Sequence, residues 1–461
     1  MNKLISYSKQ NKSFIFVLII FVMFWYLAMF PGRLGYDYAL AIRMIQDGKT
    51  TDWWTALFFW FLKITSFSGK SIFLPSLIGI FSLAFSVFYL ISTFPTTVTI
   101  RKHAVLAILM TPIFGVFGVT VSHDVFQTVG IIMLVGIEIR FLQHREINNK
   151  SLFGASFFAF FCLLSVKTGP IIILFGLVSL IIHKKLKLIL LLTPLLIGIS
   201  LISSIGISTE FMKNTKYYPV IADLKCIAQH PEARITLSEW NYLLQIAPKN
   251  YWIEPLTCAT SESASKIVNF NSPKLNFNYE FFKNYAGIVE KNPAIFIMAH
   301  LQRSRGALPP PFFQGPENQV NLDINKPLGQ GTNIALQSGP ELLHPSIDEP
   351  SVDISIGMFK PFEILAQIPT LIINQASWFW GWGGFWLLPI IYFWIKNFTN
   401  SRILRIILSL YPIFLLHTTL IILTPGSLGR YYMSTILIGI IVSIVMFLQF
   451  LKNVQSSIEL K

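Results

Sequence analysis

Long apolar runs alternate with short polar segments along most of the chain. A membrane-spanning helix needs about 20 apolar residues. Runs close to this length predict about ten transmembrane helices, at 13–30, 72–94, 103–121, 125–142, 151–166, 169–183, 187–206, 378–395, 403–423 and 431–451. Lys167-Thr168-Gly169-Pro170 separates the fifth run from the sixth, so one long broken helix is the alternative for that pair. The first run has no small-residue cleavage site after it, and we interpret it as a retained span.

The basic residues of the short loops predict the orientation of these spans. Lysine and arginine gather in every second loop, at Arg101-Lys102, Arg145 to Lys150, Lys184 to Lys187, Lys396 to Arg405 and Lys452 to Lys461. Cytoplasmic loops carry such an excess of basic residues. Both termini are therefore expected in the cytoplasm, and segments 31–71 and 207–377 outside it.

Composition excludes several classes of protein. The chain has 461 residues, 53% of them hydrophobic and only 13% charged, with a mean hydropathy of +0.59. Soluble domains carry about 25% charged residues, which excludes a water-soluble enzyme of this length, intrinsic disorder and a fibrous repeat. A net charge of +14 would suggest a nucleic-acid partner in a soluble protein. Here the basic residues lie between apolar runs, so we interpret them as topology signals and expect no nucleic acid.

We therefore predict an all-α polytopic membrane protein with a mostly α extracytoplasmic domain between spans seven and eight. It comprises an N-terminal membrane module 1–206, an extracytoplasmic domain 207–377 and C-terminal membrane helices 378–461. In the first outer loop we expect a helix at 38–47 and an aromatic interfacial helix at 53–67. In the domain we expect helices near 223–248 and 278–304 and an amphipathic segment at 357–374. Cys226 and Cys258 are candidates for a disulfide, with two buried free thiols as the alternative.

Ionisable residues from distant parts of the sequence gather on the predicted outer face. Such groups are costly at a membrane edge when unpaired and are often functional. Each also has a simpler interpretation. Asp37 and Asp124 are each suited to cap the helix that follows, and Lys167 and Arg430 are each suited to reach the interface with a long side chain. The outer-face residues are Asp37, Asp52, His123, Asp124, Lys167, Arg430 and Tyr431.

The order of these features resembles the GT-C superfamily of membrane glycosyltransferases. The first outer loop, from Gly35-Tyr36-Asp37-Tyr38 to Asp47-Gly48 and then Asp52-Trp53, is similar to the acidic loop of that family. His123-Asp124 resembles its second acid, Val166-Lys167-Thr168-Gly169 its lysine-containing junction, and Gly429-Arg430-Tyr431-Tyr432 its late arginine-tyrosine start. Related bacterial members often continue Asp-Trp with His-Pro-Pro, whereas Trp54-Thr55-Ala56 stands here.

The resemblance implies an enzyme of the cell (inner) membrane that transfers a sugar from a polyprenyl-phosphate donor. The acceptor would be a glycan or glycolipid at the outer face. The donor's lipid tail would lie between helices, and membrane lipid would be a further partner. Asp37 is the expected base and Asp124 the second acid. Lys167 and Arg430 would bind the phosphate, with Tyr431, Asp52 and His123 as further substrate contacts. No cofactor is certain, and a divalent metal remains open.

Three other functions fit part of the pattern. A transporter or flippase for a lipid-linked glycan would favour polar residues within spans and repeat-related broken helices. A glycan polymerase or ligase would carry essential residues in the large outer segment, where His300, Arg303 and Arg305 are candidates. For His300, Arg303 and Arg305 we favour the simpler interpretation that they form an ordinary solvated helix face. A non-enzymatic scaffold would depend on the outer domain alone.

Overall fold

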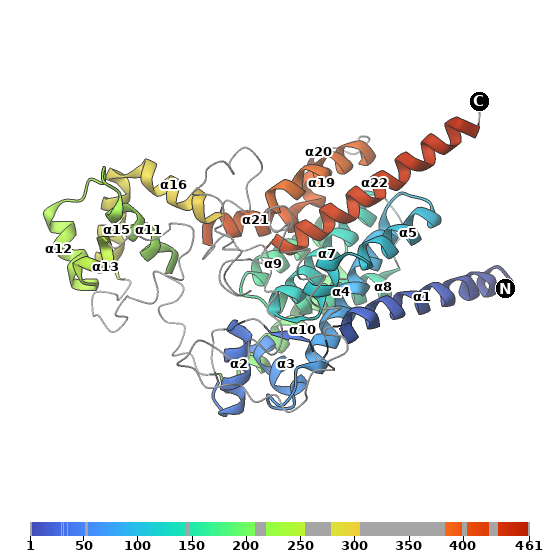
Figure 1. The fold of residues 1–461 in the computed structure, drawn as a ribbon, viewed down its shortest axis with the longest axis horizontal. Helices are drawn as coiled ribbons and strands as arrows, with labels where there is room; N and C mark the ends of the chain where they lie inside the picture. The colour runs from blue at the N-terminus through green and yellow to red at the C-terminus, as the bar shows by residue number, and fades with distance from the viewer. Residues whose placement is uncertain are drawn as a thin grey trace.

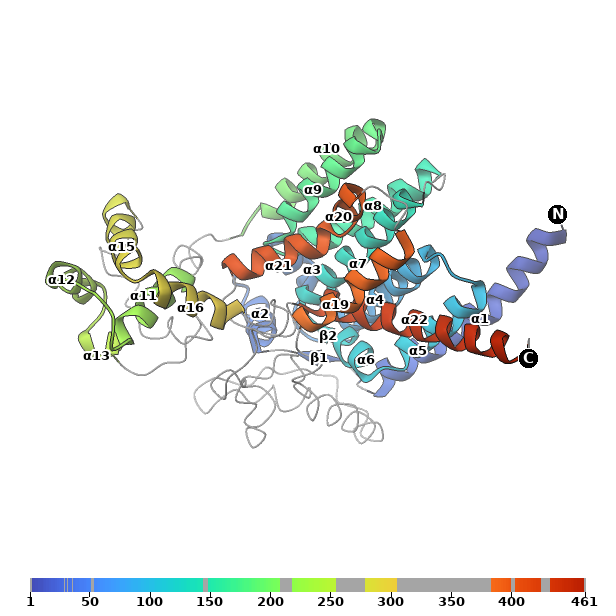
Figure 2. The ribbon, with the colours of Figure 1, turned by 90° about the horizontal axis from the view of Figure 1, so that it is seen from above.

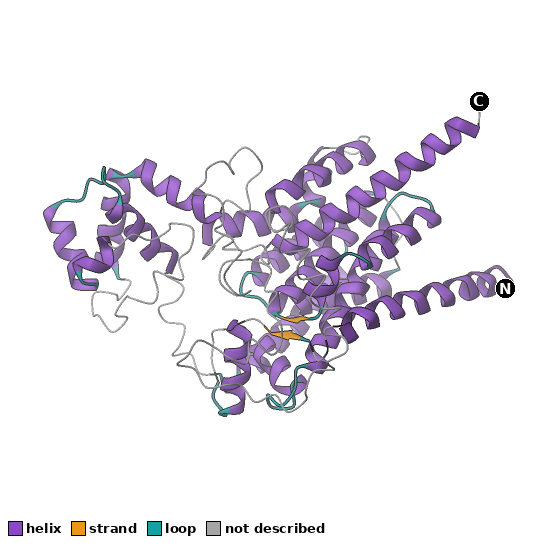
Figure 3. Ribbon diagram, in the orientation of Figure 1, coloured by secondary structure: helices purple, strands orange, loops and turns teal. Residues whose placement is uncertain are grey.

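The computed structural model describes residues 2–28, 30, 32–34, 36–50, 54–143, 148–207, 218–253, 278–304, 383–398, 403–423 and 432–459. Helices make up most of this part of the chain, as Figure 3 shows in purple. They form a bundle and a smaller helical domain beside it (Figure 1). The bundle consists of α1 (Asn2–Ala28), α4 (Phe73–Thr93), α5 (Val98–Leu109), α6 (Pro112–Gly118), α7 (His123–Leu142), α8 (Asn149–Leu164), α9 (Gly169–Ile182), α10 (Leu186–Ser204), α19 (Gly383–Phe398), α20 (Ile403–Ser409), α21 (Tyr411–Leu423) and α22 (Met433–Glu459).

Four of the described helices are long and apolar enough to cross a membrane: α4, α7, α10 and α22. Shorter apolar helices include α8 and α9 and parts of α1 and α21. The prediction of an all-α membrane protein is thus confirmed at the level of its class, while the count of ten spans and their sidedness remain predictions. Figure 1 shows both termini toward one end of the bundle, with α2 and α3 of the first outer loop and the small domain away from that end.

Helix α7 forms the centre of the bundle. It packs against α4, α8, α20 and α22 (Figure 2), and 94% of its apolar stretch is buried. A glycine allows the close approach of α8, because a Cβ atom at Gly130 would lie 2.6 Å from Cγ of Leu163 and 2.9 Å from the carbonyl oxygen of Ala159. Small residues let membrane helices approach in this way.

Two predicted spans are interrupted, and proline explains both breaks. The run 103–121 divides into α5 and α6 before Pro112 and ends in the short strand β2 (Thr120–Val121). The run 403–423 divides into α20 and α21 before Pro412. A proline lacks the N–H that would bond to the preceding turn, and its ring clashes with the carbonyl there. Each uninterrupted helix predicted at these runs was therefore wrong.

The segment between α1 and α4, the predicted first outer loop, folds against the bundle as two helices, α2 (Tyr36–Gln46) and α3 (Ala56–Thr65). Helix α2 ends at Gly48, whose φ of +68° favours glycine. The N–H groups of Gly48 and Lys49 bond to the carbonyls of Ile45 and Met44, which completes a Schellman end. Phe58 and Phe59 of α3 are buried in a small hydrophobic core with α2. The aromatic residues of α3 therefore do more than line a membrane interface.

The small domain has its own hydrophobic core. It contains α11 (Tyr218–Gln229), α12 (Leu237–Ile246), α13 (Lys249–Ile253), α15 (Tyr279–Lys291) and α16 (Pro293–Ser304). The single helices predicted at 223–248 and 278–304 are each divided. A capping box between Thr236 and Glu239 starts α12 anew, and Pro293 begins α16. Helix α16 contacts α21 of the bundle (Figure 2).

The cysteines of the chain differ in state. Cys226 in α11 is disulfide-bonded, which excludes the alternative of a free thiol there. Cys162 in α8 is free and buried. Cys258, the partner that the sequence predicts, and the amphipathic segment 357–374 lie outside the described residues.

Candidate functional site

The site is built around the first turn of α7. Ser122 caps this helix, and its side-chain oxygen accepts a hydrogen bond from the backbone N–H of Asp124 at 3.0 Å. The interpretation of Asp124 as the cap was therefore wrong. Its carboxylate lies inside the first turn, where the helix dipole stabilises negative charge.

Asp124 is buried, with 2% of its surface exposed, and it belongs to a hydrogen-bonded cluster. Oδ2 of Asp124 accepts from Oγ of Ser122 at 2.9 Å and from Oη of Tyr38 at 3.3 Å. Tyr38, in α2, also lies 2.8 Å from Nδ1 of His123 through its hydroxyl. Nε2 of His123 lies 3.5 Å from Oδ1 of Asp124. The cluster thus combines a carboxylate, an imidazole and two hydroxyls.

Aromatic rings enclose the imidazole of His123. The ring centroid of Phe58 lies 5.6 Å from it and that of Tyr38 lies 5.5 Å from it, both edge-on. Phe126 packs against Phe58 at 6.2 Å on the same side. Apolar walls of this kind strengthen the hydrogen bonds of a polar cluster, because water competes less for its donors and acceptors.

A short parallel sheet fixes the first outer loop to the start of α7. Strand β1 (Arg33–Leu34) pairs with β2, with Arg33 opposite Thr120 and Leu34 opposite Val121. Figure 3 shows the pair in orange between the bundle and the first outer loop. Gly32 precedes it with a φ of +127°, and a Cβ atom there would lie 2.5 Å from the Ser76 side chain. This position therefore needs glycine.

The junction between α8 and α9 lies next to the same helix. Nε2 of Gln127, one turn along α7 from Asp124, donates to Oγ1 of Thr168 at 3.0 Å. Oγ1 of Thr55 donates to the carbonyl of Ser165 at 2.7 Å and so connects α3 to the junction. Lys167, between these two contacts, has an exposed side chain. The structure therefore brings the segments of Asp37, Asp124 and Lys167 together.

Several predicted residues lie wholly or partly outside the described part of the structure. Asp37 precedes Tyr38 in the first turn of α2, so it lies within that helix and is not the cap that the simpler interpretation proposed. Its side chain is outside the described part of the structure, as are Asp52, Arg430 and Tyr431. Tyr432, which follows them, is buried beside α19.

Sequence reasoning missed three residues of this site: Tyr38, Ser122 and Gln127. Tyr38 is part of the quoted motif but was given no role. Ser122 could have been recognised as the preferred cap residue before an apolar run. Gln127 could have been recognised as a polar residue within a predicted span, where such groups are usually paired.

The small domain holds a second buried polar cluster. Arg303, 1% exposed, forms an ion pair with Asp223, whose Oδ1 also lies 3.1 Å from Nδ1 of His300. Burial lowers the pKa of Arg303 to about 10 and lowers that of His300, although a hydrogen bond with the backbone of Ile422 acts in the other direction. The expected solvated face was wrong, because α16 packs this side against α11. Arg305 lies outside the described residues.

No group of three histidine, cysteine or acidic residues suited to a metal ion occurs in the part of the chain that the structure describes. The hydrogen bonds from Ser122 and Tyr38 hold the Asp124 carboxylate in place, and such a carboxylate is suited to orient or deprotonate a hydroxyl group. Comparisons with protein-family models, curated proteins and solved structures found no match.

Proposed function

We propose that the chain is a membrane glycosyltransferase that moves a sugar from a polyprenyl-phosphate donor to an acceptor glycan or lipid at the extracytoplasmic face. The observation that carries this proposal is the hydrogen bond from Tyr38 to Asp124. It joins the acidic motif of the first outer loop to the second acid of the GT-C-like pattern, although 86 positions separate them. A cap or a solvated loop residue would not need this contact.

The proposal includes the ten-span topology. The spans would be α1, α4, α5 with α6, α7, α8, α9, α10, α19, α20 with α21, and α22. Support comes from the arrangement in Figure 1, where the termini lie away from the first outer loop and the helical domain. The start of α7 and the α8–α9 junction contact that loop, as a shared outer face requires.

The residues of the site suit the chemistry of sugar transfer. The acceptor hydroxyl is a weak nucleophile and needs a carboxylate within hydrogen-bond reach to take its proton. Asp37 would be this base, and Asp124, held by Ser122 and Tyr38, would position the reacting groups. Charge accumulates on the departing lipid phosphate, and fixed cations stabilise such a transition state.

Lys167 and Arg430 would supply these cations, since a guanidinium binds phosphate oxygens in pairs. His123, Asp52 and Tyr431 would contact the substrates, and the donor's lipid tail would lie between helices. Carboxylates such as Asp37 and Asp124 are ligands that divalent metals accept. The dependence on such an ion is therefore part of the test.

The decisive assay uses full-length protein reconstituted in vesicles with a radiolabelled polyprenyl-phosphate sugar and candidate glycan or lipid acceptors. Transfer of label to an acceptor supports the proposal. A chelator added to one arm reports on metal dependence. Movement of the donor across the bilayer without transfer supports the alternative of a transporter or flippase.

The transporter alternative is favoured by one specific observation, the buried carboxylate of Glu138 in α7. The polymerase or ligase alternative loses support, since Arg303 is engaged with Asp223 inside the outer domain. Asp124, by contrast, lies where the first outer loop meets the bundle, which favours the transferase.

A further inference from the structure

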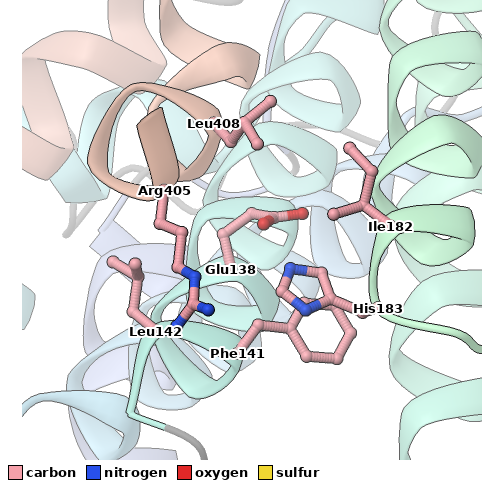
Figure 4. A pocket seen from close by; sticks show the side chains of 7 residues that line it. All are labelled: Glu138, Phe141, Leu142, Ile182, His183, Arg405 and Leu408. Carbon is pink, nitrogen blue, oxygen red and sulfur yellow. The ribbon is translucent and has the colours of Figure 1, made fainter. Parts of the chain in front are cut away.

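A second site lies at the other end of α7 and has no part in the proposed transfer. A cavity of about 160 Å3 opens between α7, α9 and α20. Glu138, His183 and Arg405 line it together with apolar side chains (Figure 4). His183 directly follows α9, and Arg405 lies in the first turn of α20. Basic residues in and beside these two segments predict the cytoplasmic side. The cavity would therefore lie at the depth of the inner-leaflet headgroups.

The negative part of this cavity is Glu138. The residue is 3% exposed, and Oγ of Ser179 donates to its Oε1 at 2.5 Å. The hydroxyl satisfies one carboxylate oxygen, and a cation that reaches a carboxylate inside a membrane span stabilises its charge. A cationic group entering the cavity would therefore be stabilised there.

The positive part lies across the same space. Figure 4 shows the guanidinium of Arg405 and the imidazole of His183 on the cavity wall opposite Leu408, with the carboxylate of Glu138 between them and Ile182. The imidazole stacks on Phe141, with ring centroids 4.0 Å apart and planes 16° apart, so its position is fixed. One acidic and two basic side chains thus line the same cavity.

The surface beside the cavity is apolar. Val178, Ile181 and Ile182 of α9 are each more than 40% exposed, and Ile182 also lines the cavity. In a bilayer such side chains contact acyl chains. A lipid lying along α9 could therefore keep its chains on this surface while its headgroup enters between α9 and α20.

We infer that this cavity binds a headgroup containing a primary ammonium and a phosphate, namely that of phosphatidylethanolamine. The ammonium would donate hydrogen bonds to Glu138, and the phosphate would face Arg405 and His183. Choline fits less well, because its methylated nitrogen donates no hydrogen bond. Phosphatidylglycerol fits less well, because it brings no cation to the buried carboxylate. Free phosphoethanolamine has the same chemistry and is the soluble alternative source.

The inference is tested by native mass spectrometry of the full-length protein with equal amounts of phosphatidylethanolamine, phosphatidylcholine and phosphatidylglycerol. We expect about a tenfold preference for the ethanolamine lipid, as one charge-assisted contact supplies. Glu138→Gln, which keeps an acceptor for Ser179, should reduce the preference to below about twofold. Asp47→Asn, which removes an exposed outer-loop carboxylate, should leave it unchanged.

Two further arms make the result decisive. Ser179→Ala removes the hydrogen bond to Glu138 but retains the carboxylate, and should retain the lipid preference. This variant shows whether the effect of Glu138→Gln comes from loss of the charge or from a disturbed local structure. Retention of phosphatidylethanolamine by the protein in nanodiscs supports the lipid as the ligand. An increase in melting temperature with free phosphoethanolamine, but no retained lipid, supports the soluble compound as the ligand. Equal retention of all three lipids by the wild-type protein, or an unchanged preference in Glu138→Gln, would overturn the inference.

Discussion

The hydroxyl of Tyr38 donates a hydrogen bond to the buried carboxylate of Asp124, across 86 positions of the sequence. The contact joins the first outer loop to the first turn of α7 and arranges the candidate site. Tyr38 neighbours Asp37, so the same contact holds the segment that carries the proposed base.

Removal of that hydroxyl should impair transfer without unfolding the protein. Tyr38→Phe leaves the ring in place and removes a hydroxyl whose contacts include the hydrogen bond to the Asp124 carboxylate. Such bonds are worth about 1.5–3 kcal/mol, which predicts about a tenfold to hundredfold lower kcat for sugar transfer. Tyr26→Phe is the matched control, because the Tyr26 hydroxyl also donates a hydrogen bond, to the backbone carbonyl of Phe73 at 3.0 Å. Equal activity of the two variants would contradict the role of Tyr38.

The proposed phosphate contacts should affect the donor more than the acceptor. Lys167→Ala and Arg430→Ala each remove a cation proposed to bind the lipid phosphate. We expect each to raise KM for the donor about tenfold and to change KM for the acceptor little. Lys49→Ala removes an exposed lysine of the first outer loop and should change neither value. Steady-state kinetics with separately varied substrates would refute the assignment if donor KM stayed constant in both variants.

The central packing of the bundle predicts a stability difference between two glycines. A Cβ atom at Gly130 meets Leu163 of α8 at 2.6 Å, whereas a Cβ atom at Gly154 of α8 meets nothing within 4 Å. Gly130→Ala should therefore lower the free energy of unfolding by about 1–3 kcal/mol through overpacking. Gly154→Ala should be neutral or slightly stabilising, because alanine favours helix. Melting in nanodiscs compares the two, and equal melting temperatures would contradict the packing.

Glu239 in the outer domain should make that domain acid-sensitive. Burial raises the pKa of its carboxyl, but hydrogen bonds from Lys291 and Thr236 outweigh burial and lower it below the usual 4.5. A lowered folded-state pKa contributes stability that is fully present above pH 4.5 and is lost as pH falls through the folded-state value. The protection factors of the backbone amides in α12, which correct for the intrinsic pH dependence of exchange, should fall below pH 4.5, and Glu239→Gln should flatten this dependence. An identical pH dependence in the wild-type and Glu239→Gln proteins would argue against a stabilising Glu239–Lys291 ion pair.

Periodic and local signals in the sequence predicted much of the fold. The apolar runs located most bundle helices, and Gly48 marked the end of α2 correctly. The breaks before Pro112 and Pro412 were visible in the sequence but were given too little weight against the length of the apolar runs. The short strands β1 and β2 have no sequence signal of their own, since two residues show no periodicity.

The partners of charged residues were harder to predict. The sequence around Arg303 has the composition of a solvated helix face. Its ion-pair partner, Asp223, lies 80 positions away in the sequence. Tyr38 and Asp124 meet for the same kind of reason. Long-range contacts follow from packing, which a single sequence does not reveal. The ends of the apolar runs, by contrast, located Asp124 at the start of α7 and Lys167 between α8 and α9.

The central claim is that the first outer loop and the start of α7 form a sugar-transfer site. The most direct measurement is transfer from a radiolabelled polyprenyl-phosphate sugar by reconstituted Asp37→Asn protein, with Asp47→Asn as the control from the same loop. The account predicts that Asp37→Asn abolishes transfer while insertion is normal and Asp47→Asn retains it. Near wild-type transfer by Asp37→Asn would contradict the account.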